Sequence, residues 1–403
     1  MKYINTIATI TILVKLGELT LKGGNRESFE LILRRNLKTM LRSRAPHSTL
    51  ESRSGRMYIH CTNQEAAEQT EDALSRLAGI TGWARAQKTE KTIDDILAAS
   101  AAEGKKIAGN GIKTFKVQAR RTDKSFPLNS YEICCAAGDA IKAISPELQV
   151  DVKNPQSIIS VEIREKAYIY GSEKKGLRGL PAGSAGRGLL LLSGGIDSPV
   201  AGCLMAGRGM GLDAVYFHTP PYTSQEALEK TIHLAEITGP YCMGMHLYIV
   251  NFSEVQKTIA GKSRPEWNTI LLRMAMIETA SLIARKTKAK CLVTGESLSQ
   301  VASQTIENIS CTESRTILPV LRPLIGMDKE SIITLAIKYG TYNTSILPYA
   351  DCCVLFSPAH PVLRGKIHEA ETLYGSLELN DLLFNAAKTA EIKRCGYYCR
   401  GAK

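Results

Sequence analysis

A short polar run in the middle of the chain has the composition of a phosphate-binding loop. It runs from Ser193 through Gly194 and Gly195 to Ser198, with Pro199 next. Glycines let backbone N–H groups approach an anion, serine hydroxyls add donors, and proline suits the first turn of a helix whose N-terminus favours negative charge. The run lacks the Gly-Lys-Ser/Thr ending of a Walker loop. It predicts a different site for nucleotide phosphates, and the alternative is an ordinary glycine-rich turn.

The elements around this run must hold it at the edge of a sheet. Four leucines at 189–192 precede it and read as a strand buried on both faces. Strand-like and helix-like segments then alternate, which predicts an α/β fold with a doubly wound parallel sheet and ligands beyond its carboxyl edge. The other predicted strands are 212–217, 246–250 and 290–294, and the predicted helices begin at 199 and cover 225–237 and 267–286.

The first 188 residues are organised as two smaller units. Strands at 4–15 and 56–61 with helices at 26–44 and 64–77 favour a ferredoxin-like α+β domain. Helices at 92–102 and 131–144 and strands at 114–120, 157–164 and 167–170 indicate a second α+β unit. Residues 176–188 are rich in Gly and Pro and read as a linker. The predicted domains are 1–60, 61–171 and 189–403, with a linker at 172–188.

Composition and charge limit the kind of partner. The chain has 403 residues, enough for two or three domains, and its short apolar stretches argue against a membrane span. No basic and apolar leader opens it, so we expect a cytoplasmic protein. Of the net charge of +12, +10 falls in residues 1–187, which favours a phosphate backbone as partner; a basic surface kept for solubility is the alternative. The 11 cysteines are scattered, as expected for reduced thiols.

The polar run resembles the Ser-Gly-Gly-x-Asp-Ser loop of N-type ATP pyrophosphatases, which cut ATP between the α- and β-phosphates and adenylate a carbonyl oxygen. Over nearly its whole length the chain resembles the tRNA 4-thiouridine synthetases, also called thiamine-biosynthesis tRNA sulfurtransferases, in their short form without a C-terminal rhodanese domain. The matching stretches are GELTLKGGNR at 17–26, FKVQARRTDKSFP at 115–127, the run at 193–201, HTPPYTS at 218–224, TGESLSQVASQ at 294–304 and DCC at 351–353.

This resemblance implies a fold and an activity. The fold is an N-terminal ferredoxin-like domain, a THUMP domain and a PP-loop adenylation domain. The activity is enzymatic and has two steps. O4 of uridine 8 in tRNA is adenylated, and that oxygen is then replaced by sulfur from a cysteine desulfurase. The family can also pass sulfur toward the thiazole of thiamine. ATP, Mg²⁺, tRNA and the desulfurase are therefore the expected cofactors and partners, and the family suggests a homodimer.

The resemblance also implies a nucleotide site. Asp197 is the expected protein contact of Mg²⁺, and a helix N-cap is its compatible alternative. Arg273 lies in an apolar helical stretch and could pair with a carboxylate instead, while Tyr216 and Phe217 would otherwise read as core. The expected ATP-binding residues are Leu191, Leu192, Ser193, Gly194, Gly195, Asp197, Ser198, Tyr216, Phe217, Arg273, Gly295 and Gln304.

Sulfur transfer needs a thiol that carries a persulfide. Cys352, in a loop rich in turn residues, is the expected carrier, with Cys353 as the close alternative. The alternative without a catalytic role is that the cysteine is a small buried apolar residue. A second thiol could resolve the intermediate by forming a disulfide, and Cys353, Cys395 and Cys399 are the candidates. Three of the four cysteines at 352, 353, 395 and 399 could instead ligate an iron–sulfur cluster. This is the less favoured option because a Cys-x3-Cys spacing is a weak signal.

Basic residues around a predicted strand are the expected RNA contacts. Arg120, Arg121 and Lys124 follow the strand that contains Lys116 and precede Phe126-Pro127. In a THUMP context they would meet phosphates of the acceptor stem and select tRNA by shape, and Lys22 and Arg26 could extend that track. A solvated cluster of charges is the alternative.

Two other classes of protein compete with a sulfurtransferase. An amide-forming ligase or nucleotide synthetase could use the same loop, but it would not need a basic front half. A catalytically silent RNA-binding protein could have kept the fold without turnover. Pyrophosphate release that requires tRNA would separate the three.

Overall fold

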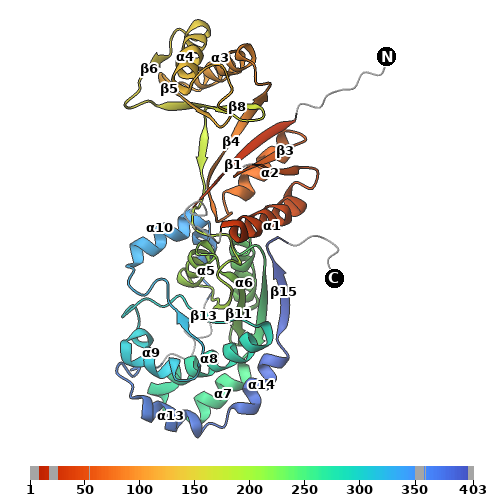
Figure 1. The fold of residues 1–403 in the computed structure, drawn as a ribbon. Coiled ribbons are helices and arrows are strands. Elements are labelled where there is room, and N and C mark those ends of the chain that lie inside the picture. The colour runs from red at the N-terminus through yellow and green to blue at the C-terminus, as the bar shows by residue number, and fades with distance from the viewer. Residues whose placement is uncertain (1–8, 18–25, 54, 350–357, 359, 398–403) are drawn as a thin grey trace. The chain divides into compact units, whose positions relative to one another are not determined.

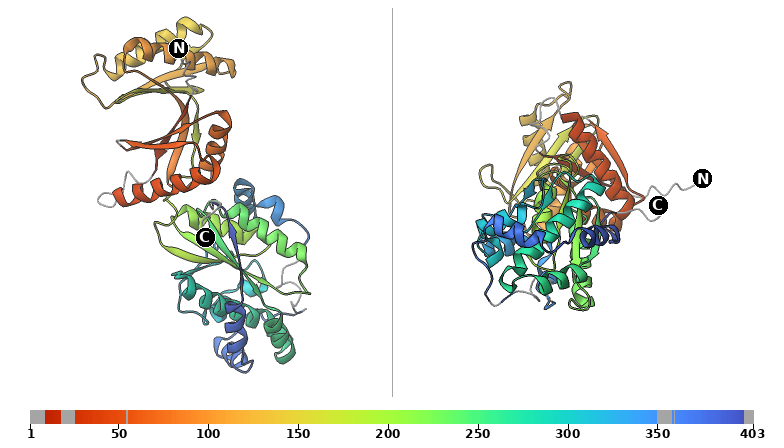
Figure 2. Two further views of the ribbon diagram at one scale, coloured as in Figure 1. Left: turned by 90° about the vertical axis from the view of Figure 1, so that its right-hand side faces the viewer. Right: turned by 90° about the horizontal axis from the view of Figure 1, so that it is seen from below.

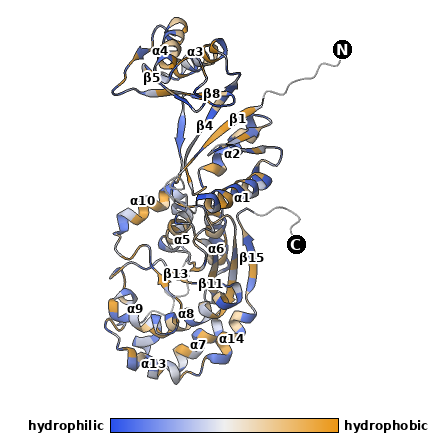
Figure 3. Cartoon of the chain, viewed as in Figure 1, coloured by the Kyte–Doolittle hydropathy of each residue, from blue (hydrophilic) through white to orange (hydrophobic). Residues whose placement is uncertain are grey.

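The structure is a computed structural model that describes residues 9–17, 26–53, 55–349, 358 and 360–397. The chain divides into two compact units. The first unit comprises residues 1–23, 40–76 and 80–178, and the second comprises 24–39, 77–79 and 179–403. Helix α1 (Arg26–Arg44) contributes residues to both. In Figure 3 this helix is largely blue, whereas strand β1 (Ile10–Leu16) of the first unit is coloured toward the hydrophobic end, as suits its buried position.

The first unit begins as an antiparallel sheet with β1 in its middle. Strand β1 pairs with β3 (Arg56–Cys61) on one side and β4 (Ile80–Thr89) on the other, and β2 (Thr49–Arg53) extends the β3 edge. Helix α2 (Gln64–Leu74) connects β3 to β4 and is N-capped by Asn63. The sequence did not predict β2 or β4, because β2 is mostly exposed and polar and β4 has a glycine and charged residues in its run.

The rest of the first unit continues the same sheet. Strand β4 pairs at its far end with β8 (Ala167–Tyr170), so the nine strands form one sheet in the order β2-β3-β1-β4-β8-β7-β5-β6, with β9 beside β4. Helices α3 and α4 pack together over β5, β7 and β8, as Figure 1 shows. The bounds are α3 Ile93–Gly109, β5 Thr114–Arg121, α4 Ser130–Ile144, β6 Gln149–Val150, β7 Ser157–Ile163 and β9 Glu173–Lys175.

Beneath these helices lies an apolar core that includes Phe115, Ile141 and Val161. Strand β4 pairs with β1 in one half of this sheet and with β8 in the other, so the sheet is continuous across the first unit. The described strands alone therefore mark no domain boundary, and the domain bounds expected from the sequence stay predictions.

The second unit contains a six-stranded sheet in the order β14-β13-β10-β11-β12-β15. The first five strands are parallel, which confirms the predicted α/β sheet, but β15 runs antiparallel to β12. The weak pattern of the chain's last thirty residues had hidden this edge strand, because four of its five residues are exposed. The bounds are β10 Arg187–Leu191, β11 Gly211–His218, β12 Met245–Asn251, β13 Leu292–Val293, β14 Val320–Leu321 and β15 Glu391–Cys395.

Helices flank this sheet on both faces, as the views in Figure 2 show. Helices α5 and α6 contact β11, and α8 and α14 contact β10 and β12 respectively. The largest core gathers around α8, with Leu189, Val215 and Leu271 fully buried. The bounds are α5 Asp197–Gly207, α6 Gln225–Thr238, α7 Ser253–Lys262, α8 Asn268–Thr287, α9 Ile306–Glu313, α10 Lys329–Tyr339, α11 Tyr342–Ser345, α13 Ile367–Gly375 and α14 Asn380–Lys388.

The parallel register brings one end of each central strand to a common edge. Leu190 lies opposite Ala214 of β11 and Val293 of β13, so the chain leaves β10, β11 and β13 on the same side of the sheet. Ligands of such sheets bind beyond this carboxyl edge. Across the described ranges, every helix falls short of the combined length and apolarity that a bilayer crossing requires.

Candidate active site

A cavity of about 240 Å³ opens at the carboxyl edge of the second unit's sheet. Eleven of the twelve residues expected to bind ATP line it, and the twelfth, Gly194, lies within the same loop. Residues that the sequence reasoning did not select complete the wall. The cavity is lined by Leu191, Leu192, Ser193, Gly195, Asp197, Ser198, Tyr216, Phe217, Arg273, Met276, Ile277, Thr294, Gly295, Glu296, Gln304 and Thr312.

The loop from Ser193 to Ser198 is held by its own hydroxyl groups. The Ser198 Oγ accepts from the Ser193 backbone N–H at 2.9 Å and lies 3.0 Å from the Ser193 Oγ. The Ser193 Oγ in turn accepts from the Gly195 N–H at 3.3 Å. Helix α5 begins within this run, at Asp197, so backbone N–H groups and the positive end of a helix meet at the cavity. This arrangement can hold an anion.

Gly295 occupies a position where only a hydrogen fits. A Cβ built there would lie 2.6 Å from the Ser198 backbone nitrogen and 2.8 Å from the Asp197 carbonyl carbon. Both neighbours are backbone atoms, so they cannot turn aside as a flexible side chain could. The glycine therefore lets the segment after β13 lie directly against the first turn of α5, which closes one side of the cavity.

Asp197 projects from the first turn of α5, and it is not the N-cap. The N-cap residue is Ile196, which makes no side-chain capping bond, so the capping alternative is wrong. Instead, the Asp197 carboxylate accepts from the Lys329 Nζ at 2.6 Å and from the Gln300 Nε2 at 2.9 Å. Lys329 opens helix α10, 132 residues further along the chain. The sequence reasoning missed this lysine, because nothing local marks a partner so distant.

A buried carboxylate holds Arg273 in the cavity wall. Glu296 is 3% exposed, and one of its oxygens accepts from the Arg273 guanidinium. Its other oxygen accepts from the Arg322 Nε at 2.7 Å and from the Thr294 hydroxyl at 2.8 Å. Arg273 therefore has the carboxylate partner that the alternative interpretation described, and both residues of the pair line the cavity, so its role in ATP binding stays a prediction.

The charge on Glu296 is maintained by its two arginines. Burial by itself would raise the pKa of this carboxyl, but the Arg273 and Arg322 guanidiniums outweigh burial and hold the pKa below its ordinary value. Arg273 keeps one buried N–H, at Nε, without a partner among the described residues. The cluster thus presents a fixed guanidinium with a donor to spare. Glu296 directly follows the strand end Thr294-Gly295, and this position at the carboxyl edge is the sequence signal that could have identified it as a site residue.

Tyr216 and Phe217 combine the two roles that the sequence left open. They are 1% and 5% exposed, and the Phe217 ring lies 4.7 Å from that of Phe252 in the core. Both also line the cavity with Leu191 and Leu192, at the ends of two neighbouring strands. Together they give the cavity an apolar wall that suits the face of a purine.

The cysteines expected to handle sulfur are mostly beyond what the structure describes. Cys352, Cys353 and Cys399 lie outside the described residues. Cys395 is 1% exposed, and burial raises the pKa of its thiol to about 11. It pairs with Met245 at the first residue of β12, so the length of that strand, about 20 Å, separates it from the carboxyl edge. Cys395 is thus badly placed to resolve an intermediate at the cavity.

The described part of the chain contains no group of three or more His, Cys, Asp or Glu side chains that could hold a metal ion. Eight cysteines within the same ranges are free thiols. The iron–sulfur option concerned mainly cysteines outside these ranges, and it stays a prediction.

The basic residues around β5 do not all face the same way. Lys116 and Arg120 are on the face of the strand opposite to Phe115, whose side chain enters the core under α3 and α4. Arg121 is on the core side and donates to the carbonyls of Lys124 and Phe126, at 3.2 and 2.9 Å. Arg120 is exposed and available to a phosphate, whereas Arg121 secures the turn after the strand.

The remaining expected RNA contacts divide between the two units. Lys124 is exposed in the first unit. Arg26 belongs to the second unit, where its Nε donates to Glu30 at 2.7 Å. Lys22 lies outside the described residues. These residues therefore belong to different units, and a common track stays a prediction.

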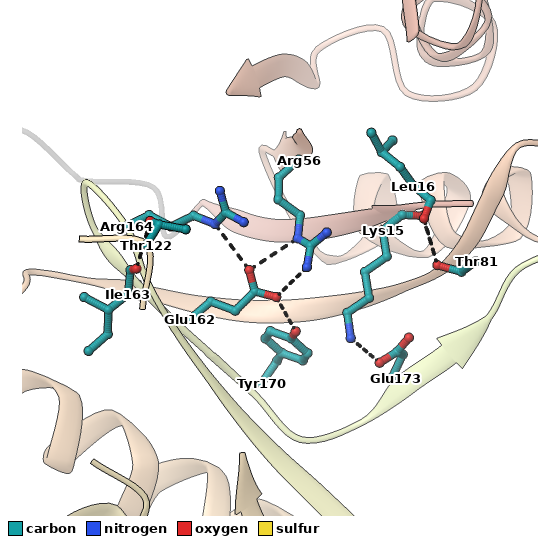
Figure 4. A network of polar contacts seen from close by, with 10 residues as sticks. All are labelled: Lys15, Leu16, Arg56, Thr81, Thr122, Glu162, Ile163, Arg164, Tyr170 and Glu173. Atoms are coloured by element: carbon teal, nitrogen blue, oxygen red, sulfur yellow. Dashed lines mark hydrogen bonds and ion pairs between the residues drawn. The ribbon is translucent and has the colours of Figure 1, made fainter. Parts of the chain in front are cut away.

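Two further arginines of the first unit pair with one buried carboxylate, shown in Figure 4. Glu162 accepts from Arg56 at 3.1 Å, from Arg164 at 3.3 Å and from the Tyr170 hydroxyl at 2.8 Å. Burial would raise the pKa of Glu162, but the Arg56 guanidinium outweighs it and lowers the pKa. Arg56 thus joins β3 to Glu162 on β7, and the Tyr170 hydroxyl connects β8 to the same carboxylate. The two arginines stabilise the long sheet and are not counted as RNA contacts.

Profiles of three protein families match the chain. The profile described as thiamine biosynthesis protein (ThiI) matches residues 183–379, the ThiI ferredoxin-like domain matches 11–84, and the THUMP domain matches 90–171. Fold, cavity and profiles together define a PP-loop α/β domain combined with a ferredoxin-like and a THUMP domain.

Close relatives agree with these profiles along nearly the whole chain. A probable tRNA sulfurtransferase of Treponema pallidum (strain Nichols) is 48% identical over 384 residues, 95% of each chain. One of Thermoanaerobacter sp. (strain X514) is 43% identical over 358 residues, 89% of this chain and 93% of the relative. The chain therefore belongs to the tRNA sulfurtransferase family.

Solved structures share the fold. A crystal structure of a 4-thiouridine synthetase–RNA complex with bound ATP has a TM-score of 0.88 and 33% identity, covering 96% of this chain and 100% of the other. PH1313 from Pyrococcus horikoshii has a TM-score of 0.63 and 26% identity, covering 82% and 99%. The first of these shows that a protein with this arrangement of domains accommodates both RNA and ATP.

Proposed function

We propose that this chain is an ATP-dependent tRNA sulfurtransferase that converts uridine 8 of tRNA to 4-thiouridine. One observation carries the proposal: the Ser193–Ser198 loop, the apolar strand ends and Arg273 meet in one cavity at the carboxyl edge of the sheet. A silent RNA-binding protein would have no use for this convergence. A sulfurtransferase needs it, because the 4-oxo group of uridine is a poor leaving group until it is adenylated.

In the adenylation step, O4 of uridine attacks the α-phosphorus of ATP, and the bond to the β-phosphate oxygen breaks. The purine would lie on the apolar wall formed by Leu191, Leu192, Tyr216 and Phe217. Backbone N–H groups of Gly194 and Gly195 would hold the departing pyrophosphate at the positive end of α5. Arg273, fixed by Glu296, would donate to the AMP part.

Asp197 is the cavity-lining residue best suited to Mg²⁺. This ion commonly uses one or two carboxylates together with substrate phosphates. Glu296, the other carboxylate in the wall, is saturated by two arginines and Thr294. Asp197 lines the cavity and is bound by Lys329 and Gln300, and a phosphate-bound ion would take over one of its oxygens. The ion would neutralise charge on the triphosphate.

For the sulfur step we propose Cys352 as the persulfide carrier, with Cys353 as the alternative. The outer sulfur of the persulfide attacks C4, the C4–O4 bond breaks and AMP leaves with that oxygen. A second thiol then attacks the carrier's sulfur, so that a disulfide forms and the thiocarbonyl of 4-thiouridine is released. Because Cys395 lies at the far end of β12 and Cys399 follows it by only four residues, Cys353 is the better candidate for the resolving thiol. A dithiol reductant must then restore both cysteines.

The expected partners follow from this chemistry. A cysteine desulfurase would supply the persulfide sulfur, and tRNA would be held in part by Lys116, Arg120 and Lys124. We also propose that the protein acts in the cytoplasm, forms a homodimer and can supply sulfur for thiamine thiazole. These points rest on the family resemblance and not on the geometry of the cavity.

Pyrophosphate release tests the proposed activity. Purified full-length protein with ATP, Mg²⁺ and unmodified tRNA should release pyrophosphate, and adding desulfurase, cysteine and reductant should yield 4-thiouridine detectable by mass spectrometry of the digested tRNA. A tRNA with cytidine at position 8 is the matched control and should give neither product. Release without tRNA would indicate a ligase or synthetase, and tight tRNA binding without release would indicate a silent binder.

A further inference from the structure

Lys230, on helix α6, is a buried cation next to the phosphate-binding loop. Lys230 is 7% exposed. Its ammonium donates to the carbonyl oxygen of Leu347 at 2.7 Å and lies 3.5 Å from the carbonyl oxygen of Tyr349. Burying an ammonium is costly unless acceptors surround it. Two acceptors among the described residues are backbone carbonyls of one short segment, and these bonds act on the path of that segment.

The stem of the same lysine lies beside the loop. A Cβ built on Gly194 would lie 3.5 Å from both the Cδ and the Cε of Lys230, so these methylenes occupy the space next to this glycine. Lys230 therefore lies between Gly194 and Leu347: its stem is the neighbour of the phosphate-binding loop, and its ammonium binds the segment that follows α11.

Ser345 forms a second, independent connection between the same two segments. Its hydroxyl donates to the carbonyl oxygen of Gly195 at 3.2 Å, and the residue is buried at the end of α11. The segment 345–349 thus binds Gly195 of the loop directly and binds the ammonium of Lys230, whose stem lies beside Gly194. Two separate hydrogen-bonding groups therefore hold the segment next to adjacent glycines of the loop.

The sequence gives this segment its importance, because Asp351-Cys352-Cys353 follows it. Cys352 is three residues beyond Tyr349, and three residues span at most about 11 Å when fully extended. Fixing Tyr349 therefore limits how far the Cys352 backbone can lie from the loop, whatever its conformation.

We propose that Lys230 and Ser345 are positioning residues for sulfur transfer. They hold the segment before the cysteine pair against the phosphate-binding loop, so that the persulfide is delivered where the adenylated uridine is formed. This inference rests on the proposed function. A misplacement of about 1 Å can slow a reaction about a hundredfold, so losing either attachment should affect sulfur transfer far more than adenylation.

Lys230→Met separates the two contacts of the lysine. Methionine keeps a flexible apolar stem beside Gly194 but cannot donate to the carbonyls of Leu347 and Tyr349. Lys230→Arg keeps a donor, and Ser345→Ala removes the other attachment without burying a charge. Lys257→Met is the matched control, because Lys257 is an exposed helical lysine that pairs with Glu254.

The experiment follows both half-reactions in the full chain, using ATP labelled at the α-phosphate and unmodified tRNA. Lys230→Met should adenylate tRNA within about threefold of wild type and form 4-thiouridine at least about tenfold more slowly, so that labelled tRNA accumulates. Ser345→Ala should show a smaller deficit of the same kind, Lys230→Arg should recover part of the rate, and Lys257→Met should match wild type.

Two results would overturn the inference. Equal losses of adenylation and thiolation in both Lys230→Met and Ser345→Ala would mean that these residues only support the nucleotide loop. Unchanged thiolation in both variants would mean that the segment needs no fixing. If the wild-type protein adenylates tRNA but never forms 4-thiouridine, the proposed function has failed instead. The reaction of the wild-type protein alone distinguishes this case.

Discussion

Replacing Glu296 by glutamine tests the ionic cluster that holds Arg273 in the cavity wall. The substitution preserves size and one carbonyl oxygen but removes the charge that two arginines share. The Arg273 and Arg322 side chains are 21% and 12% exposed, so neither guanidinium can be fully rehydrated in place. Breaking a buried ion pair from one side costs about 3–5 kcal/mol. Because glutamine still accepts one hydrogen bond, we expect the lower end, about 3 kcal/mol.

The loss should be visible in thermal unfolding of the second unit. For a unit of this size each kcal/mol shifts Tm by about 2–4 °C, so Glu296→Gln should lower it by about 6–12 °C. Trp83 and Trp267 are the chain's two tryptophans, one in each unit. In a Trp83→Phe background, the fluorescence of buried Trp267 therefore reports on the second unit alone.

The same variant makes a prediction about pH. The folded-state pKa of Glu296 is below its ordinary value, so the charge contributes stability that is fully present above that ordinary value, about 4.3, and is lost as pH falls through the folded-state pKa. The difference between wild type and Glu296→Gln should stay constant from about pH 6 to 8 and shrink below about pH 4.

An exposed carboxylate provides the control. Glu254→Gln removes the partner of Lys257 on the surface and should change stability by less than about 0.5 kcal/mol. A loss below about 1 kcal/mol in Glu296→Gln, or a difference that persists undiminished at pH 3, would refute the claim that the charge of Glu296 holds the two arginines.

The other predictions concern single side chains. Gly295→Ala should weaken ATP binding at least about tenfold by pushing its segment off the first turn of α5, and unchanged affinity by calorimetry would show that the turn yields. Arg120→Ala should lower tRNA affinity and reduce the salt slope by about one, whereas Arg121→Ala should lower stability with the slope unchanged; the opposite pattern would reverse their roles. Cys352→Ser should adenylate tRNA normally but form no 4-thiouridine, and undiminished product would move the role to another cysteine.

Much of the site could be predicted because its signals are local. The Ser193–Ser198 run and the leucines before it are contiguous, so their chemistry and their strand are readable together. The parallel order of β10 to β13 followed from alternating apolar and amphipathic segments. The ends of those strands then had to share an edge, and the family resemblance assigned Tyr216 and Gly295 at that edge to the nucleotide site.

What escaped prediction depends on contacts between distant segments. Glu296 and Lys329 act through partners at positions 273 and 197, and no spacing rule connects them. Arg121 looked like its neighbour Arg120 in the sequence, but strand alternation turned it toward the core side. Strand β15 has too few buried residues to show a pattern, because an edge strand is stabilised by one neighbour and faces solvent elsewhere.

The central claim is that backbone N–H groups of the loop clasp the outer phosphates of ATP. A crystal structure of the full chain with a non-hydrolysable ATP analogue and Mg²⁺ tests it most directly. The β- and γ-phosphate oxygens should lie within about 3 Å of the Gly194 and Gly195 nitrogens, with the purine on Tyr216 and Phe217. A triphosphate bound elsewhere, or an analogue whose purine occupies the loop, would contradict the account.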